Sequence, residues 1–496
     1  MNRHIRKVAV LGSGVMGSRI ACHFANIGCQ VVLLDIVPRE PTPEEQSKGL
    51  TMEHPAFRNR IVNGSLDFAL KSNPSPIYRK SFATRIKTGN FDDDMALIKD
   101  CDWVIEVVIE RLDIKQQVFE KVEQYRTPGT LITSNTSGIP IHMMLDGRSD
   151  DFKKHFCGTH FFNPPRYLQL LEIIPTPSTD PAIVDFLMDY GSKILGKKTV
   201  LCKDTPAFIA NRVGVYSIMA LFHAVKSMGL TVEEVDKLTG PVLGRPKSAT
   251  FRTCDVVGLD TLVHVANGLK ANCPNDEAKE LFELPDYISK MVENNWLGSK
   301  SGQGFYKKVK GEGGKSEIQV LDLNTLEYKP SQKVKFATLE MTKPVEDLKQ
   351  RTKMLFAGAD KAGEFYRTLF AGLFAYVSNR LPEITDNLYK IDDALKAGFG
   401  WELGPFETWD AVGVEKFAAI CKEHGKVVHP WVQKMIESGI TSFYKVENGT
   451  RYFYDINTNS ILQSNKLYIG ANGFFSFMRI NTLDYKFYGS IPDSSL

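Results

Sequence analysis

A glycine-rich turn between a short apolar strand and a helix constrains the fold of this chain more than any other stretch. Residues 7–11 (Lys-Val-Ala-Val-Leu) have the pattern of a buried parallel strand, and glycines follow at GxGxxG spacing in residues 12–17. Apolar residues then recur at helical spacing up to Gly28, and a second apolar run, residues 31–34, ends on Asp35. Strand, glycines, helix, strand and acid in this order indicate a βαβ unit that binds a dinucleotide.

The parts of this unit have separate physical roles. Gly12 allows the tight turn, Gly14 lets backbone N–H groups approach a pyrophosphate, and Gly17 lets the helix pack on the strand. The positive end of the helix would face the phosphates. Asp35 would bond the ribose hydroxyls and repel a 2′-phosphate, which favours NAD, while the nearby Arg39 keeps NADP as an alternative. FAD proteins share the opening motif, but we find no second flavin signature. The predicted cofactor residues here are Gly12, Gly14, Val15, Met16, Gly17 and Asp35.

Further apolar runs extend this unit into a larger sheet. They alternate with helical patterns such as 113–125 and 181–195, and β-α alternation is typical of a doubly wound, Rossmann-type α/β sheet. Ligands bind beyond the carboxyl ends of such strands, where Glu110, Ser137 and His160 fall. The expected parallel strands are 103–109, 130–134, 158–162, 168–174 and 199–202.

A histidine and a glutamate stand at the ends of residues 160–172, His-Phe-Phe-Asn-Pro-Pro-Arg-Tyr-Leu-Gln-Leu-Leu-Glu. Two apolar strand-like runs joined by the Pro-Pro turn can bring His160 and Glu172 together. The carboxylate would then hold one ring nitrogen and leave the other free as a general base. The alternative is an ordinary histidine packed in the core.

Composition excludes some classes of function. The formal net charge is +3 and no long run of like charges suggests a nucleic-acid arm. No apolar stretch reaches membrane-spanning length, and no apolar leader follows the N-terminus, so we expect no membrane span and no export. The eight cysteines are scattered without a Cys-x-x-Cys pair, so we expect buried thiols, no metal site and a reducing compartment, the cytoplasm.

Several motifs together resemble a known family. GSGVMG (12–17), SNTSG (134–138), HFFNP (160–164), Glu172, KDTPAFIANR (203–212) and SGQGFY (301–306) are similar to the 3-hydroxyacyl-CoA dehydrogenases of fatty-acid β-oxidation. The likeness covers roughly residues 5–310. Similarity to the dehydrogenase portions of multifunctional β-oxidation enzymes extends it to about residue 445.

The resemblance implies NAD-dependent oxidation of an (S)-3-hydroxyacyl-CoA to the 3-oxoacyl-CoA. It implies that His160 takes the hydroxyl proton and that Glu172 orients it, while the substrate carbon gives its hydride to NAD. The further implied roles are a hydrogen bond to the substrate oxygen from Ser137, contacts to the thioester and alcohol oxygens from Asn211, a turn beside His160 shaped by Asn163, and positions along the nicotinamide ribose for Glu110 and Lys115.

Two departures from the family accompany these matches. Residues 36–91 contain six prolines and nine Lys or Arg against five Asp or Glu, and do not align with the family's helical hairpin that meets the CoA phosphates. They are either a solvated, irregular excursion or a basic arm over the cofactor cleft. Ala207 stands where the family commonly has glycine. The possible phosphate-binding substitutes are Arg58, Arg60, Lys71, Arg79 and Lys80.

Two other functions stay open at this point. A related β-hydroxyacid dehydrogenase would act on a small acid without CoA, but such enzymes rely on a catalytic lysine. A catalytically retired member would serve as a structural or binding protein, and the joint presence of His160, Glu172, Ser137 and Asn211 speaks against it.

The C-terminal part of the chain repeats itself. FRTCDVVG (251–258) returns as FETWDAVG (406–413), and two shorter blocks, 287–291 and 305–306, return as 431–435 and 443–444. Three matched blocks in one order indicate an internal repeat. Each copy is expected to open with a long helix, 206–228 with Thr205 as its N-cap and 355–381.

The second copy has no KDTP-like motif, so we expect it to be structural. Because single-copy relatives dimerise through this helical domain, the second copy could supply the partner's role within one chain and leave a monomer. An enoyl-CoA hydratase is a possible functional partner. The expected domains are 1–204 (NAD-binding), 205–310 (first helical), 311–350 (polar linker), 351–446 (second helical) and 447–496 (unassigned).

Overall fold

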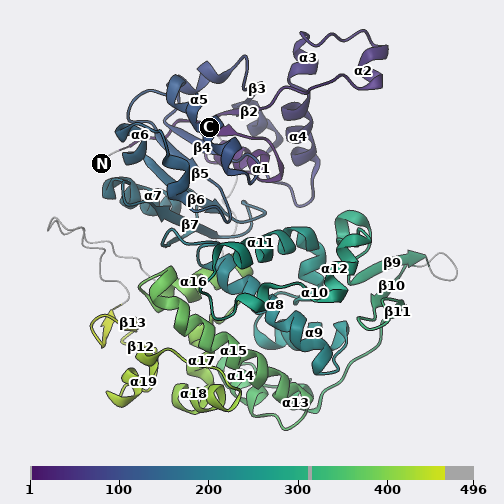
Figure 1. The fold of residues 1–496 in the computed structure, drawn as a ribbon, viewed down its shortest axis with the longest axis vertical. Helices are drawn as coiled ribbons and strands as arrows, with labels where there is room; N and C mark the ends of the chain where they lie inside the picture. Colours follow the sequence, from purple (N-terminus) through teal and green to yellow (C-terminus); the bar gives the residue numbers. More distant parts are fainter. Residues whose placement is uncertain (1–2, 311–315, 464–496) are drawn as a thin grey trace, which may run out of the picture.

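The computed structural model describes residues 3–310 and 316–463 and places a sheet domain above a larger helical part (Figure 1). The sheet has eight strands in the order β3-β2-β1-β4-β5-β6-β7-β8. Its strands are β1 (Lys7–Leu11), β2 (Gln30–Asp35), β3 (Ile86–Asn90), β4 (Trp103–Glu106), β5 (Leu131–Ser134), β6 (Phe156–Phe161), β7 (Leu170–Pro175) and β8 (Lys198–Leu201).

The sheet is parallel from β3 to β6, and the helices α1 (Val15–Asn26), α5 (Leu112–Tyr125) and α7 (Pro181–Lys193) connect its strands. The expectation of a parallel strand at 168–174 is wrong, because β7 pairs antiparallel to β6. The physical reason is the connection: a short turn returns the chain beside its own strand, whereas a parallel partner needs a long crossover. This hairpin is what aligns residue 160 with residue 172.

The excursion after β2 is more regular than its proline content suggests. It forms α2 (Pro43–Ser47), α3 (Pro55–Arg58) and α4 (Arg60–Lys71) before β3 joins the sheet edge beside β2. Thr42 opens α2 with a capping box to Glu45, and Pro43 and Pro55 occupy first-turn positions where proline is tolerated. The irregular interpretation of residues 36–91 is therefore wrong.

The helical part contains two segments that lie against one another below the sheet (Figure 1). The first has α8 (Ala210–Ser227), α9 (Val232–Thr239), α10 (Phe251–Val257), α11 (Leu259–Asn272), α12 (Asp286–Glu293) and the strands β9 (Tyr306–Lys310), β10 (Ser316–Leu321) and β11 (Tyr328–Pro330). The second has α15 (Lys361–Ile384), α16 (Leu388–Phe399), α17 (Pro405–Val412), α18 (Val414–Glu423), α19 (Pro430–Glu437) and the strands β12 (Tyr444–Glu447), β13 (Thr450–Asp455) and β14 (Ser460–Gln463).

The two segments repeat the same hydrogen bonds. The Asp255 carboxylate accepts from the backbone N–H groups of Phe305 and Tyr306 at 2.8 and 2.9 Å, and Asp410 accepts from those of residues 443 and 444 at 2.7 and 3.0 Å. The likeness continues into the strands that follow. Asp322 and Asp455 each cap a turn by accepting from the residues two and three positions later. The structural repetition thus runs beyond the expected ends of both copies.

Three local expectations fail in the helical part. The first helix opens at Ala210 rather than at residue 206, because Ala207 and Phe208 have φ angles of 61° and 52° and cannot be helical. The second opening helix is divided into α14 (Leu348–Ala357) and α15, with Asp360 capping α15. Segment 311–350 is no plain linker, since it holds β10, β11, α13 (Ala337–Thr342) and the start of α14.

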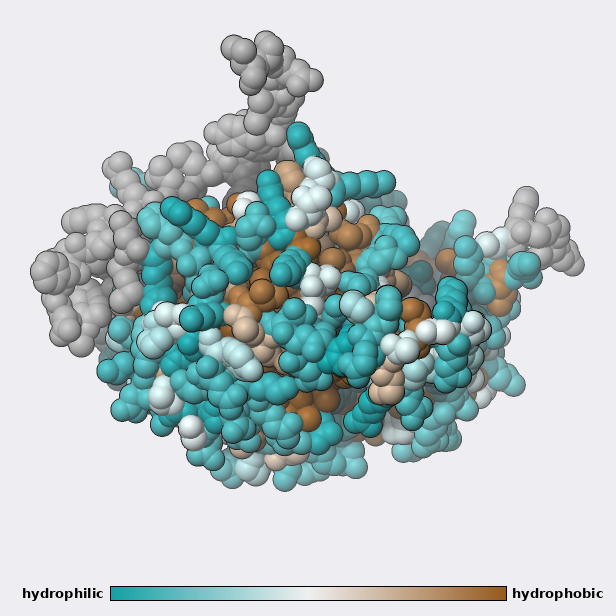
Figure 2. Space-filling view, turned by 90° about the horizontal axis from the view of Figure 1, so that it is seen from above, coloured by the Kyte–Doolittle hydropathy of each residue, from teal (hydrophilic) through white to brown (hydrophobic). Residues whose placement is uncertain are grey.

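The surface at the sheet-domain end is mostly hydrophilic, with apolar residues gathered near its centre (Figure 2). Among residues 3–310 and 316–463, no helix has both the length and the apolar character needed to cross a bilayer. Of the unassigned tail, residues 447–463 belong to the last three-stranded sheet, and residues 464–496 lie outside the described part of the chain.

Candidate functional site

The glycine-rich turn has the shape that a dinucleotide requires. Gly12 has a φ of +103°, and a Cβ atom there would lie 2.5 Å from the Val107 carbonyl oxygen. A Cβ atom at Gly17 would overlap the Gly12 carbonyl, so the helix packs against the turn only because no side chain intervenes. At Gly14, by contrast, a Cβ atom would meet nothing within 4 Å. Gly14 is also the N-cap of α1 and supplies no side-chain cap, which leaves the helix N-terminus available for an anion.

Asp35 is held in place beside this turn. One carboxylate oxygen accepts from the Ser13 backbone N–H at 2.6 Å and from its hydroxyl at 2.5 Å, and the other accepts from the Ile36 N–H at 2.7 Å. The carboxylate is therefore fixed at the end of β2, and Arg39 is exposed four residues later. Ser13, inside the GxG sequence, was not anticipated.

Three apolar side chains are exposed at the carboxyl end of the sheet. Val15, Ile36 and Ile109 follow β1, β2 and β4 and are 57%, 56% and 61% exposed. Apolar walls with a few polar groups are typical of cofactor clefts. Ile36 and Ile109 were not among the predicted cofactor residues, although an apolar residue one to three positions beyond a strand end was the available signal.

Glu110 and Lys115 belong to a charged network that is mostly buried. Lys115 Nζ lies 2.9 Å from Glu106 Oε1 and 3.3 Å from Glu110 Oε2, and the lysine and Glu106 are fully buried. Glu110 Oε1 also accepts from the Thr136 hydroxyl and from the N–H groups of Ser137 and residue 138. Burial works to raise the pKa of Glu110, but Lys115 and these hydrogen bonds outweigh it and lower that pKa. The carboxylate thus fixes the loop that carries Ser137.

His160 and Glu172 form a buried, directly bonded pair. They face each other in the antiparallel register of β6 and β7, and His160 Nδ1 lies 2.7 Å from Glu172 Oε2. The other carboxylate oxygen accepts from the backbone N–H groups of Ile209 and Ala210 at 3.1 and 2.8 Å, which are the first donors of α8. A helix N-terminus is a favourable place for a negative charge. Glu172 is therefore fixed from both sides.

The environment of this pair leaves one histidine nitrogen available. The rings of Phe162 and Phe208 lie 4.5 and 5.7 Å from the His160 ring, and no group in the described part of the chain binds Nε2. Cys202 lies beside Glu172, and burial together with that carboxylate holds the pKa of its thiol well above the ordinary value. The arrangement can accept a proton at Nε2 and share the resulting charge with Glu172.

The other predicted site residues lie around this pair. Ser137 follows β5, where Asn135 accepts from the Phe161 N–H at 2.9 Å and so ties the loop to the strand of His160. Asn211 is in the first turn of α8, next to the N–H groups that bind Glu172, and is partly exposed. Asn163 is exposed in the turn between β6 and β7.

The basic side chains of the excursion are mostly paired with carboxylates. Arg58 lies 2.6 Å from Asp93, Lys71 lies 2.6 Å from Asp67, and Arg60 pairs with Glu45. Arg79 and Lys80 are exposed and have no ion pair in the described residues. Of the five basic residues predicted as possible phosphate ligands, Arg79 and Lys80 are therefore the two that remain available to bind a phosphate.

Asp204, in the KDTP sequence, joins the two parts of the molecule at the site. It accepts from the N–H groups of Ile141 and His142 at 2.6 and 2.8 Å, and from His142 Nδ1 at 2.6 Å. It thereby caps the turn that follows Ser137. Ala207, which replaces a common glycine of the family, has the positive φ angle that glycine adopts without strain.

Comparisons with known proteins agree with this geometry. Residues 7–205 match the family described as "3-hydroxyacyl-CoA dehydrogenase, NAD binding domain", and residues 208–308 match "3-hydroxyacyl-CoA dehydrogenase, C-terminal domain". The "Probable 3-hydroxyacyl-CoA dehydrogenase" of Bacillus subtilis is 47% identical over 94% of this chain, which spans only 58% of that protein's length. A protein of the same name from Deinococcus radiodurans is 46% identical over 62% of this chain and 84% of its own length.

A solved structure extends the fold comparison into the second helical segment. The crystal structure of 3-hydroxybutyryl-CoA dehydrogenase from Escherichia coli covers 88% of this chain and 99% of its own, with a TM-score of 0.60 and 19% sequence identity. At that identity the likeness concerns the fold alone. The sheet domain of this chain is the family's NAD-binding domain, and residues 208–308 are the family's C-terminal domain. The chain belongs to the 3-hydroxyacyl-CoA dehydrogenase family.

Proposed function

We propose that this chain oxidises (S)-3-hydroxyacyl-CoA to 3-oxoacyl-CoA with NAD, as a step of fatty-acid β-oxidation, and that His160 is its general base. The observation that carries the proposal is the buried His160–Glu172 pair, whose carboxylate also accepts from the N-terminus of α8. A histidine with one nitrogen fixed and the other unpaired has the form that a positioned base needs.

The chemistry follows from what each side chain can hold. Nε2 of His160 would take the proton of the substrate hydroxyl, while bound NAD supplies the acceptor for the hydride at C3. Glu172, bonded to Nδ1, would keep the ring in the tautomer with Nε2 free and then stabilise the imidazolium. Ser137 and Asn211 would orient the alcohol and thioester oxygens. Their backbones are already fixed by Glu110 and by the first turn of α8.

The CoA thioester distinguishes the proposed substrate from that of the alternative enzyme, a β-hydroxyacid dehydrogenase that acts on a small acid without CoA. With NADH, acetoacetyl-CoA should be reduced with a kcat/KM at least about 100-fold above that of free acetoacetate, because remote binding energy from the CoA portion serves catalysis. Absorbance at 340 nm measures both rates. Equal rates for the two substrates would favour a β-hydroxyacid dehydrogenase. A failure of both substrates, with NADH binding intact, would favour a retired member of the family.

The second helical segment is proposed to be a second copy of the C-terminal domain that takes the place of a dimer partner. Gly244 and Gly400 have nearly equal left-handed φ angles of 66° and 67°. The residues that follow them meet: Arg245 Cζ lies 3.7 Å from the centroid of the Trp401 ring. Equivalent residues thus meet as they would across a two-fold axis. The 55.7 kDa chain should sediment as a monomer at micromolar concentration. A stable dimer under those conditions would contradict this role.

The cellular setting is also a proposal. All eight cysteines are free and buried, as expected of thiols in a reducing compartment such as the cytoplasm. An enoyl-CoA hydratase would supply the 3-hydroxyacyl-CoA, and relatives named as trifunctional fatty acid oxidation enzymes support this partnership.

A further inference from the structure

Arg212 ties the helix that holds Glu172 to the second helical segment. It is fully buried in the first turn of α8 and follows Asn211 directly. Its Nε donates to the Tyr376 hydroxyl at 2.7 Å, and its Nη2 donates to Asp276 Oδ2 at 2.6 Å. Tyr376 lies on α15, and its hydroxyl donates to the same Asp276 oxygen at 2.9 Å. The three groups form a closed, buried triangle across the two segments.

The position of Arg212 determines the position of the N–H groups that bind Glu172. Those groups belong to Ile209 and Ala210, less than one helical turn away on the same helix. Because a helix is stiff over one turn, an anchor at Arg212 holds the donors against the carboxylate. The carboxylate in turn holds His160 Nδ1 at 2.7 Å. Tyr376 is thus connected to His160 through Arg212, the first turn of α8 and Glu172.

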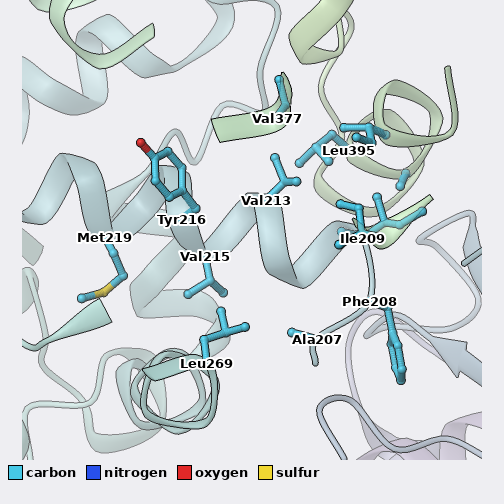
Figure 3. Close-up of a cluster of buried hydrophobic side chains, with 14 of the residues drawn as sticks. Ala207, Phe208, Ile209, Val213, Val215, Tyr216, Met219, Leu269, Val377 and Leu395 are labelled. Atoms are coloured by element: carbon cyan, nitrogen blue, oxygen red, sulfur yellow. The ribbon is translucent and has the colours of Figure 1, made fainter. Parts of the chain in front are cut away.

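Packing adds to this connection. Val377 and Leu395, from α15 and α16, lie beside Val213 of α8 and Ile209, the N-cap of that helix (Figure 3). The Tyr376 ring stacks on Tyr216 of α8, with ring centroids 3.8 Å apart. Little room is left for α8 to move relative to α15.

The second segment also reaches the sheet side of the site. A Cβ atom at Gly398 of α16 would lie 2.7 Å from Leu170 Cδ2 and 3.4 Å from the Phe162 ring. That ring is the one 4.5 Å from His160. The second segment therefore contacts the surroundings of both members of the pair.

We propose that Tyr376 is a positioning residue for the reaction: through Arg212 it holds the N-terminus of α8 against Glu172, so the second helical segment completes the active site. This inference rests on the proposed function and deepens it. Asp276 is the second member of the anchor, and Glu383, 3.1 Å from Arg212, keeps the arginine paired when the Tyr376 hydroxyl is removed.

The test compares two single-atom changes on the same helix. Tyr376→Phe removes the hydroxyl of the anchor, and Tyr366→Phe is the matched control. The Tyr366 hydroxyl is equally buried, donates to Leu238 O of the first segment at 2.8 Å, and has no part in the Arg212 anchor. With acetoacetyl-CoA and NADH, His160 must donate the proton, so its ionisation sets the high-pH limb of the kcat/KM profile. Tyr376→Phe should lose about tenfold in kcat and shift that limb by about half a pH unit, since small displacements of a positioned group are costly. Tyr366→Phe should change neither quantity.

A second readout does not depend on activity. The proton on His160 Nδ1 is buried and bonded to a carboxylate, so it should give a downfield NMR resonance, assigned by its absence in His160→Gln. It should move upfield in Tyr376→Phe and keep its wild-type position in Tyr366→Phe. An unchanged resonance together with an unchanged pH profile in Tyr376→Phe would overturn the positioning role. A wild type without dehydrogenase activity but with the shift in Tyr376→Phe would refute the proposed function and leave the positioning role standing.

Discussion

His160→Gln is expected to lower kcat for acetoacetyl-CoA reduction by about 10³–10⁴-fold, toward the upper end of the range for positioned acid–base catalysis. Nε2 is the nitrogen that would exchange a proton with the substrate oxygen, since Nδ1 is bonded to Glu172. Glutamine fills a similar space and can still donate to Glu172, but its amide does not titrate near neutral pH. The measurement is the steady-state rate of NADH oxidation at 340 nm.

The control for this variant is NADH binding. The glycine turn and Asp35 are on other strand ends, so the Kd for NADH from fluorescence titration should stay within about twofold of the wild type. A loss of NADH binding in parallel with activity would instead mean that the substitution had disrupted the domain. A wild-type kcat in a folded variant that binds NADH would refute the role of His160 as the general base.

Glu172→Gln is expected to lower kcat by about 10²–10⁴-fold and to destabilise the fold. The amide oxygen would accept from the Ile209 and Ala210 N–H groups in place of the carboxylate oxygen, which turns the amide NH₂ toward His160 Nδ1. Nδ1 must then accept, so the ring proton moves to Nε2 and the base is blocked. The buried carboxylate also loses its charge-assisted hydrogen bonds, which contribute about 1.5–3 kcal/mol each. Thermal unfolding measures the loss of stability. NAD reduction at 340 nm with (S)-3-hydroxybutyryl-CoA, the direction in which His160 is the base, measures the loss of rate.

Glu172→Asp separates orientation from charge. The aspartate keeps the negative charge but is one methylene shorter, so it cannot bond Nδ1 and the α8 donors at the same time. We expect it to regain part of the lost rate. A Glu172→Gln variant with more than a tenth of the wild-type kcat would contradict the orienting role.

The features that sequence analysis predicted correctly are those encoded by local patterns. The βαβ unit around Gly12 and Asp35 depends on a glycine turn and on strand and helix periodicity, all within about 30 residues. His160 and Glu172 are twelve positions apart in one hairpin, whose register puts them directly opposite each other and so on the same face. The similar sequences around Asp255 and Asp410 predicted a repeat, and each of these carboxylates accepts from the corresponding backbone N–H groups in its own segment.

The features that could not be predicted depend on contacts between distant residues. Ala207 and Phe208 adopt positive φ angles at the point where the chain enters the helical part, although Thr205-Pro206 has the local signature of a helix start. The strand that begins at Ile86 lies in a proline-rich, basic segment without a clear strand pattern. It could not be predicted because it depends on pairing with β2. Arg212 and Tyr376 are 164 residues apart, and nothing in either local sequence indicates the other.

The most direct test of the central claim is a single-turnover experiment on this chain. NADH-loaded protein in excess is mixed with acetoacetyl-CoA in a stopped-flow instrument, so that the decay at 340 nm reports the chemical step without product release. The account predicts a fast decay for the wild type and a decay at least about 10³-fold slower for His160→Gln. Equal decay rates for the two proteins would contradict the assignment of His160 as the group that transfers the proton.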